Sequence, residues 1–121
     1  MCESFHVQPP NPALPAGGLS GGNQQKLMVG REVASNPAVV IAHGPTHGLD
    51  LAAAAAIRNR LAEAAARGAA VVVISADLDE VIGISDRIVV LAGNRVSDVI
   101  DVQGAAPDLA RLGRAMAGAV A

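Results

Sequence analysis

The sequence predicts an α/β fold, and three observations support this prediction. Short runs of β-branched residues alternate with longer helical segments through the middle of the chain. Two further strand patterns flank the turn dipeptide Gly93-Asn94, which is typical of a hairpin. The chain has 121 residues, of which 51% are hydrophobic, so it can bury a modest aliphatic core. Alternating strands and helices favour a parallel sheet, to which the hairpin would add a small antiparallel edge.

The first part of the chain is expected to hold an irregular lead and one helix. Four prolines and a glycine pair interrupt any regular structure in residues 1–18. Ser20 is a favourable N-cap residue, and apolar residues follow it at helical spacing. We therefore expect a helix over about residues 22–35, ended by Asn36-Pro37.

The middle of the chain is expected to contain two buried strands separated by a long helix. The run Val39–Ala42 is short, apolar and β-branched, as a fully buried parallel strand is. Asp50 is expected to cap an alanine-rich helix over Leu51–Arg67, with Gly68 just beyond its C-terminus. The run Ala70–Ser75 predicts a second fully buried strand.

The C-terminal part is expected to hold two helices around the hairpin. Leu78–Ile84 predicts a short helix, and Pro107–Ala119 predicts a terminal one. Between them, Arg87–Ala92 and Arg95–Ile100 are expected to pair as strands across the turn at Gly93-Asn94.

Composition excludes several classes of function. Phe5 is the only aromatic residue and the net charge is −2, so the chain offers neither a stacking platform nor a basic surface for nucleic acid. A single cysteine, Cys2, excludes an internal disulfide framework and a cysteine-rich zinc site. The N-terminal residues do not resemble a signal peptide, and the longest apolar run, Gly68–Ala76, is far shorter than the roughly 18 residues of a membrane span.

The most informative segment is Leu19–Lys26, which reads Leu-Ser-Gly-Gly-Asn-Gln-Gln-Lys. Gly21 and Gly22 would let a ligand approach the backbone closely at the start of a helix. Free amides and the helix dipole favour an anion there, and Ser20 adds a hydroxyl donor. The segment alone could equally be an ordinary helix start, because short glycine-rich motifs are weak evidence out of context.

The wider sequence resembles the ATP-binding domains of ABC transporters, in particular the extended signature of sugar and nucleoside importers. Landmarks of that family follow the signature in order. They are the strand Val39–Ala42, the segment Pro45–Asp50, the strand and helix start Val72–Val81, the segment Ser85–Leu91 and the turn Gly93–Val96. The resemblance implies a partial P-loop NTPase fold with parallel core strands, flanking helices and a C-terminal β-hairpin, in which the Walker A half is missing. Residues 1–18 would be a remnant of the helical subdomain, and residues 19–121 the C-terminal portion of the nucleotide-binding domain.

The resemblance also implies a site that acts in trans. The signature residues would contact ATP bound to the Walker A segment of another nucleotide-binding domain, and the D-loop residues would line the interface between the two domains. The signature positions are Ser20, Gly21, Gly22, Asn23, Gln24 and Gln25, and the D-loop positions are Gly48, Leu49 and Asp50. ATP would be held mainly by that partner, which would also supply Mg²⁺.

Three departures from the family pattern imply that the chain is inactive alone. No G-x-x-x-x-G-K-[ST] segment is present to hold phosphates. The Walker B aspartate and catalytic glutamate fall at His43 and Gly44, and neither residue replaces a carboxylate in Mg²⁺ binding or in activating water. The H-loop histidine falls at Ala76. His43 and His47 lie four residues apart, but no further ligands are near, so we expect no metal site.

These considerations lead to one main hypothesis and two alternatives. The chain would be an ATP-binding subunit, or a fragment of one, of a bacterial sugar or nucleoside importer, with membrane permease subunits as further partners. It would lie in the cytoplasm at the inner face of the membrane. The missing Walker A half would leave apolar surface exposed, so we expect dimerisation, self-association or dependence on a partner. The alternatives are a non-enzymatic interaction module that docks on an ABC ATPase or permease, and an inactive remnant.

Overall fold

The computed structural model describes residues 21–102, 104 and 106–118. These residues divide between Ala76 and Asp77 into two compact units, unit 1 before that boundary and unit 2 after it. The predicted lead segment and the predicted N-cap Ser20 lie outside the described residues. The two units are considered separately. Among the helices in the described part of the chain, none combines the length and the apolar character that a membrane span requires.

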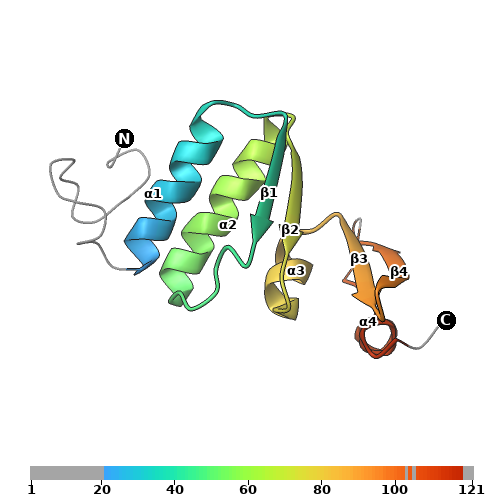
Figure 1. Cartoon of the computed structure of the whole chain (residues 1–121). Coiled ribbons are helices and arrows are strands. Elements are labelled where there is room, and N and C mark those ends of the chain that lie inside the picture. The colour runs from blue at the N-terminus through green and yellow to red at the C-terminus, as the bar shows by residue number, and fades with distance from the viewer. Residues whose placement is uncertain (1–20, 103, 105, 119–121) are drawn as a thin grey trace, which may run out of the picture. The chain divides into compact units, whose positions relative to one another are not determined.

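Unit 1 contains two helices and a two-stranded parallel sheet (Figure 1). Its elements in chain order are α1 (Gly21–Ala34), β1 (Val39–His43), α2 (Leu51–Ala66) and β2 (Ala70–Ile74). The strands pair in register from Val39 opposite Ala70 to His43 opposite Ile74. Helix α2 packs on β2, and α1 packs along α2. This is the βαβ arrangement that the alternating pattern predicted, and its helix bounds agree with the predicted ones.

The core of unit 1 lies on the inner face of α2. Ile57 and Leu61 are 0% and 1% exposed, and Ala64 is 2% exposed. Val29 and Val33 of α1 pack into the same interior. The small alanines of α2 let the two helices approach closely, and burial of the larger aliphatic side chains stabilises the unit.

The two strands of unit 1 are not fully buried, so this part of the sequence prediction was wrong. Burial alternates along both strands, and the outward side chains are strongly exposed: Val39 57%, Ile41 69%, Val72 48% and Ile74 48%. Parallel sheets are normally covered on both faces. In the described residues, helices cover only one face, and the other is an apolar surface.

Unit 2 is built on the hairpin. Its elements are α3 (Leu78–Ile84), β3 (Arg87–Ala92), β4 (Arg95–Asp101) and α4 (Leu109–Met116). Gly93 and Asn94 both have positive φ, 57° and 60°, which is the backbone of the tight hairpin turn that the sequence predicted. Within the described residues β3 and β4 form a sheet of their own, whereas the sequence predicted an edge of the parallel sheet.

The core of unit 2 forms between the hairpin and α4. Five buried side chains make it up: Ile88, Val90, Ile100, Leu112 and Ala115. Leu112 is 1% exposed and is the largest of the fully buried apolar side chains in this unit. The inward residues of β3 alternate with exposed ones, as expected for a strand with one covered face.

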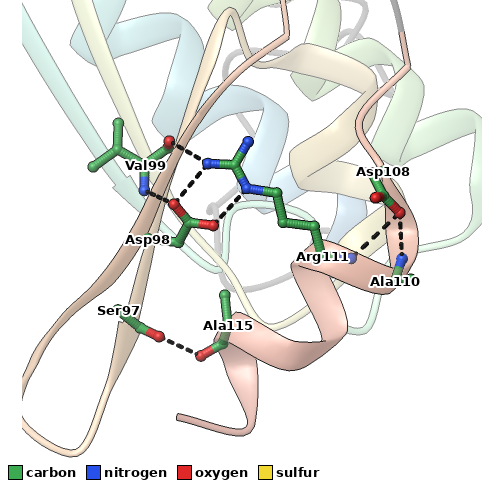
Figure 2. A network of polar contacts seen from close by, with 7 residues as sticks. All are labelled: Ser97, Asp98, Val99, Asp108, Ala110, Arg111 and Ala115. Carbon is green, nitrogen blue, oxygen red and sulfur yellow. Dashed lines mark hydrogen bonds and ion pairs between the residues drawn. The ribbon is translucent and has the colours of Figure 1, made fainter. Parts of the chain in front are cut away.

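Polar contacts attach α4 to β4 at both ends (Figure 2). Arg111 donates two hydrogen bonds to Asp98, from Nε at 2.7 Å and from Nη2 at 2.8 Å. These bonds lower the pKa of Asp98 against the opposing effect of burial, with a smaller contribution from the Val99 amide. A β-bulge leaves Ser97 without a partner on β3, and its hydroxyl donates to the Ala115 carbonyl at 2.7 Å. The bulge therefore directs a donor to the C-terminal turn of α4.

Candidate functional site

The first turn of α1 begins at Gly21, and its surface is open. Gly21 is exposed, and a Cβ placed on it would meet no atom within 4 Å. Gln24 is also exposed on this turn, whereas Asn23 is half-buried. The backbone at the helix N-terminus can thus be approached by a ligand from the Gly21 side. Ser20, the first of the predicted phosphate-contacting residues, lies outside the described part.

Gly22 has a different environment from its neighbour. A Cβ on Gly22 would lie 3.1 Å from the Cβ of Ala53 and 3.9 Å from Cδ2 of Leu49. Gly22 is therefore the point at which α1 approaches the start of α2. The predicted signature and D-loop segments meet here, because Leu49 belongs to the loop that precedes α2.

The loop between β1 and α2 is a series of hydrogen-bonded turns. The His47 amide donates to the Gly44 carbonyl at 3.1 Å, and the Leu49 amide donates to the Thr46 carbonyl at 3.2 Å. Gly44 and Gly48 have φ of 56° and 73°, a region that favours glycine. The chain needs these two glycines to complete both turns within a short loop.

Two contacts hold this loop at its ends. Nε2 of Gln25 in α1 donates to the Pro45 carbonyl at 2.7 Å. The Asp50 carboxylate accepts from the Ala53 amide at 2.7 Å, which confirms Asp50 as the N-cap of α2. The predicted D-loop segment therefore lies beside the first turns of α1.

The carboxyl ends of β1 and β2 lie at one edge of the parallel sheet. The Gly44 amide donates to the Ile74 carbonyl at 2.8 Å and extends the ladder beyond β1. His43 ends β1 and is exposed, and Ala76 follows β2, also exposed. Ligand sites of open α/β sheets lie at such an edge. None of the residues named at this edge has a carboxylate side chain.

The chemistry of these residues fits one part of an ATP site and not another. The open helix start at Gly21 fits a phosphate group, because amides at a helix N-terminus bind anions. The strand ends do not fit Mg²⁺, which prefers carboxylate oxygens to the imidazole of His43. Across the described residues, no group of three or more His, Cys, Asp or Glu side chains could hold a metal ion.

Sequence reasoning missed two features of the site. The contact of Gln25 with Pro45 and the packing of Gly22 on Ala53 both join segments that are distant in the chain. No local pattern marks either one, because a glutamine or glycine at these positions is equally compatible with a solvent-facing helix start. Knowledge that α1 lies along α2 would have been required.

Comparison with known proteins shows related ATP-binding proteins. The chain is 40% identical over 100 residues to the ribose import ATP-binding protein RbsA of Geobacillus kaustophilus (strain HTA426), covering 83% of this chain and 20% of that protein. It is 37% identical over 103 residues to the galactose/methyl galactoside import ATP-binding protein MglA of Escherichia coli (strain K12), covering 85% and 20%. The chain thus spans about a fifth of the length of these relatives. No protein-family model matches it.

Solved structures give the same result for the fold. A dimeric bacterial ABC transporter cassette superposes with a TM-score of 0.72 at 26% identity, over 84% of this chain and 44% of the cassette. The ATP-binding subunit of another ABC transporter superposes with a TM-score of 0.77 over 96% of this chain and 51% of that subunit, at 23% identity. The chain is therefore homologous, over most of its length, to the ATP-binding proteins of ABC sugar importers, and has the α/β fold of part of their cassette.

Proposed function

We propose that this chain completes, in trans, an ATP site whose phosphate-binding loop belongs to another ABC cassette, and that it hydrolyses no ATP with its own residues. The observation that carries the proposal is the juxtaposition within unit 1 of an open helix start at Gly21 and the loop that leads to Asp50. A phosphate-binding turn and an interface loop beside each other suit a surface that closes over a nucleotide held elsewhere.

The phosphate contact would come from the start of α1. Ser20 would add its hydroxyl, and the amides of Gly21 and Gly22 would donate to the γ-phosphate. Asn23, Gln24 and Gln25 would support this helix start and shape the interface, with Gly48, Leu49 and Asp50 beside it. The chain has no P-loop lysine, so the charge that neutralises the phosphates has to come from the partner cassette.

The chain's own strand edge would contribute no hydrolysis. His43 and Gly44 stand where a Mg²⁺-binding acid and a water-activating acid are expected, and Ala76 offers only a methyl group where a γ-phosphate contact is expected. Orientation of the attacking water would be the task of the cassette that holds ATP and Mg²⁺. The proposed role is therefore ATP sensing and site completion.

The partners follow from the relatives. Because these relatives are ATP-binding proteins of ribose import and of galactose/methyl galactoside import, we propose a sugar as the transported solute class, with nucleosides as the alternative. The chain would bind a second nucleotide-binding domain that carries a Walker A segment, and the assembly would sit on membrane permease subunits at the cytoplasmic face. We propose that residues 19–121 act as the C-terminal portion of such a domain.

A reconstituted ATPase assay tests the proposal. The chain is added to a P-loop cassette whose own signature segment has been disabled, and MgATP hydrolysis is measured. We expect the chain to raise the rate, and Gly21→Arg to reduce that stimulation by about tenfold or more, equivalent to ~1.4 kcal/mol. Ser20→Arg is expected to behave in the same way, because both variants place a bulky side chain where the phosphate would lie.

Gly113→Arg is the matched control. Gly113 also lies in a helix with no atom within 4 Å of a Cβ, but it belongs to α4 in unit 2. The control variant should stimulate as the unmutated chain does. Equal stimulation by the Gly21 and Gly113 variants would refute contact in trans.

The second candidate is a non-enzymatic docking module, which the exposed apolar face of β1 and β2 favours. Val39, Ile41, Val72 and Ile74 all expose large fractions of their side chains there. Such a module would bind an ABC ATPase or permease without touching nucleotide. Crosslinking from a cysteine introduced at Gln24, in a chain that also carries Cys2→Ser, decides between the two. Crosslinking yields that change with ATP support the trans site, and yields that are indifferent to ATP support docking.

A further inference from the structure

We propose that Gln25 is a positioning residue that couples the phosphate-binding turn of α1 to the interface loop before α2. This inference rests on the proposed function and deepens it, because it assigns one side chain to the connection between the two parts of the trans site. The juxtaposition behind it is the hydrogen bond from Gln25 Nε2 to the Pro45 carbonyl, 2.7 Å long and partly buried.

Gln25 lies about one helical turn beyond Gly21 and Gly22, on the part of α1 that faces α2. Gly22 and Val29 mark that face, since the first approaches Ala53 and the second is buried. Residues three and four positions apart share a side of a helix. A displacement of the first turn of α1 therefore carries the Gln25 amide with it.

Pro45 occupies the start of the loop that the amide holds. It is buried, as is Thr46, and the next turns run from Gly44 to His47 and from Thr46 to Leu49. The carbonyls that accept these two turn hydrogen bonds belong to Gly44 and Thr46, the residues on either side of Pro45. Movement of the Pro45 carbonyl therefore changes the orientation of both turns.

The far end of the loop is connected to the same helix turn by packing. Asp50 binds the Ala53 amide, and the Ala53 Cβ would lie 3.1 Å from a Cβ on Gly22. The loop is thus attached to the start of α1 at both ends, by a hydrogen bond at Pro45 and by close packing at Ala53. Of these attachments, the Gln25 side chain is the one that can be removed without opening the helix interface.

The test compares variants of Gln25 in the full chain with a matched control. Gln25→Glu keeps the size of the side chain, but its ionised carboxylate has no proton to donate to the Pro45 carbonyl. Gln25→Leu removes the donor at every pH. Asn59→Asp is the control, because it makes the same amide-to-acid change at an exposed position of α2.

Amide hydrogen exchange of His47 and Leu49 gives the first measurement. Both amides donate the turn hydrogen bonds of the loop. We expect roughly fivefold lower protection in Gln25→Leu and in Gln25→Glu at neutral pH, the factor that corresponds to one neutral hydrogen bond. Below about pH 4 the protonated glutamate becomes a donor, so Gln25→Glu should recover protection and Gln25→Leu should not. A purely steric role of Gln25 would show no such difference.

Stimulation of the signature-disabled P-loop cassette with MgATP gives the second measurement. Both Gln25 variants should lower the maximal stimulation at neutral pH, while Asn59→Asp keeps it. Unchanged protection of His47 and Leu49 in Gln25→Leu would overturn the positioning role, and lost protection with full stimulation would overturn the coupling. If the unmutated chain itself gives no stimulation, the proposed function fails, and the exchange measurement still decides whether Gln25 positions the loop.

Discussion

Replacing Gly22 with alanine is expected to destabilise unit 1, although alanine is the better helix former. In a helix interior this change stabilises by up to about 1 kcal/mol. Against this gain, the new Cβ would lie 3.1 Å from the Cβ of Ala53, and overpacking of this kind costs about 1–3 kcal/mol. The net expectation for Gly22→Ala is a loss of about 0–3 kcal/mol.

The neighbour of Gly22 has little freedom to move aside. A Cβ has no rotamer, so Ala53 can yield only if the α2 backbone shifts. Ala53 is 5% exposed, and its amide is bound to the Asp50 carboxylate at 2.7 Å. Gly21→Ala meets no atom within 4 Å, so we expect it to be neutral or to stabilise by up to about 1 kcal/mol.

Urea unfolding of the full chain measures the difference. The amide signals of α2 should be followed, so that unit 1 is monitored separately from unit 2. A difference of about 1–3 kcal/mol between the two variants corresponds to roughly 1 M in the unfolding midpoint for a small protein. If Gly22→Ala proves as stable as Gly21→Ala, the close approach of α1 and α2 at this glycine is refuted.

Four further changes have defined outcomes. Leu112→Ala should cost about 2–5 kcal/mol and unfold unit 2, seen as loss of dispersed hairpin amide signals. Asp50→Ala should cost about 1 kcal/mol in a thermal melt, and Asp50→Ser should retain most of that stability. The pKa of Asp98 is lower in the folded chain than in the unfolded chain, so ionised Asp98 stabilises unit 2 at any pH above the unfolded-state pKa, and this stabilisation is lost as the pH falls through the folded-state pKa. The hydrogen-exchange protection of the α4 amides should fall over the same pH range. In Asp98→Asn, the protection should not depend on pH in that range. Ile41→Lys should abolish self-association in sedimentation without unfolding the chain, because Ile41 is 69% exposed.

Each of these outcomes has a contrary result. A folded hairpin in Leu112→Ala would mean that α4 is not part of its core. Equal melting temperatures of Asp50→Ala and Asp50→Ser would show that the side chain at position 50 does not stabilise α2 as an N-cap. If α4 amide protection depends on pH in Asp98→Asn as it does in the unmutated chain, the titrating group is not Asp98. If the unmutated chain is a monomer in sedimentation, the prediction for Ile41→Lys has no basis.

The element bounds were predictable because local chemistry sets them. Asp50 caps α2 through its own carboxylate, and the pair Gly93-Asn94 adopts the positive φ that the hairpin turn requires. These signals act within a few residues. They have the same effect whatever packs on the finished element, so a single sequence contains enough information to locate them.

The exposure of the strands was not predictable in the same way. The run of valines and isoleucine over Ala70–Ile74 looks the same whether one face of the sheet is covered or both. The bulge at Ser97 was missed for a related reason, since only the α4 carbonyl that receives its hydroxyl explains the extra residue. Within the candidate site, Gly21 and Gly22 are adjacent and identical in sequence, and only the contact with Ala53 separates their roles.

The left-handed backbone at Gly44 limits which residues can replace this glycine. A glutamate introduced there would have to adopt a φ near 56°, which costs a residue with a side chain about 1–3 kcal/mol. The backbone could leave that region only by undoing the turn to His47 and the bond to the Ile74 carbonyl. The shape of the main chain at Gly44 therefore disfavours any residue with a side chain, an acid included. A single substitution would introduce a carboxylate without fixing its position, so giving this chain the water-activating acid that the proposed function assigns to its partner would require the whole loop to change.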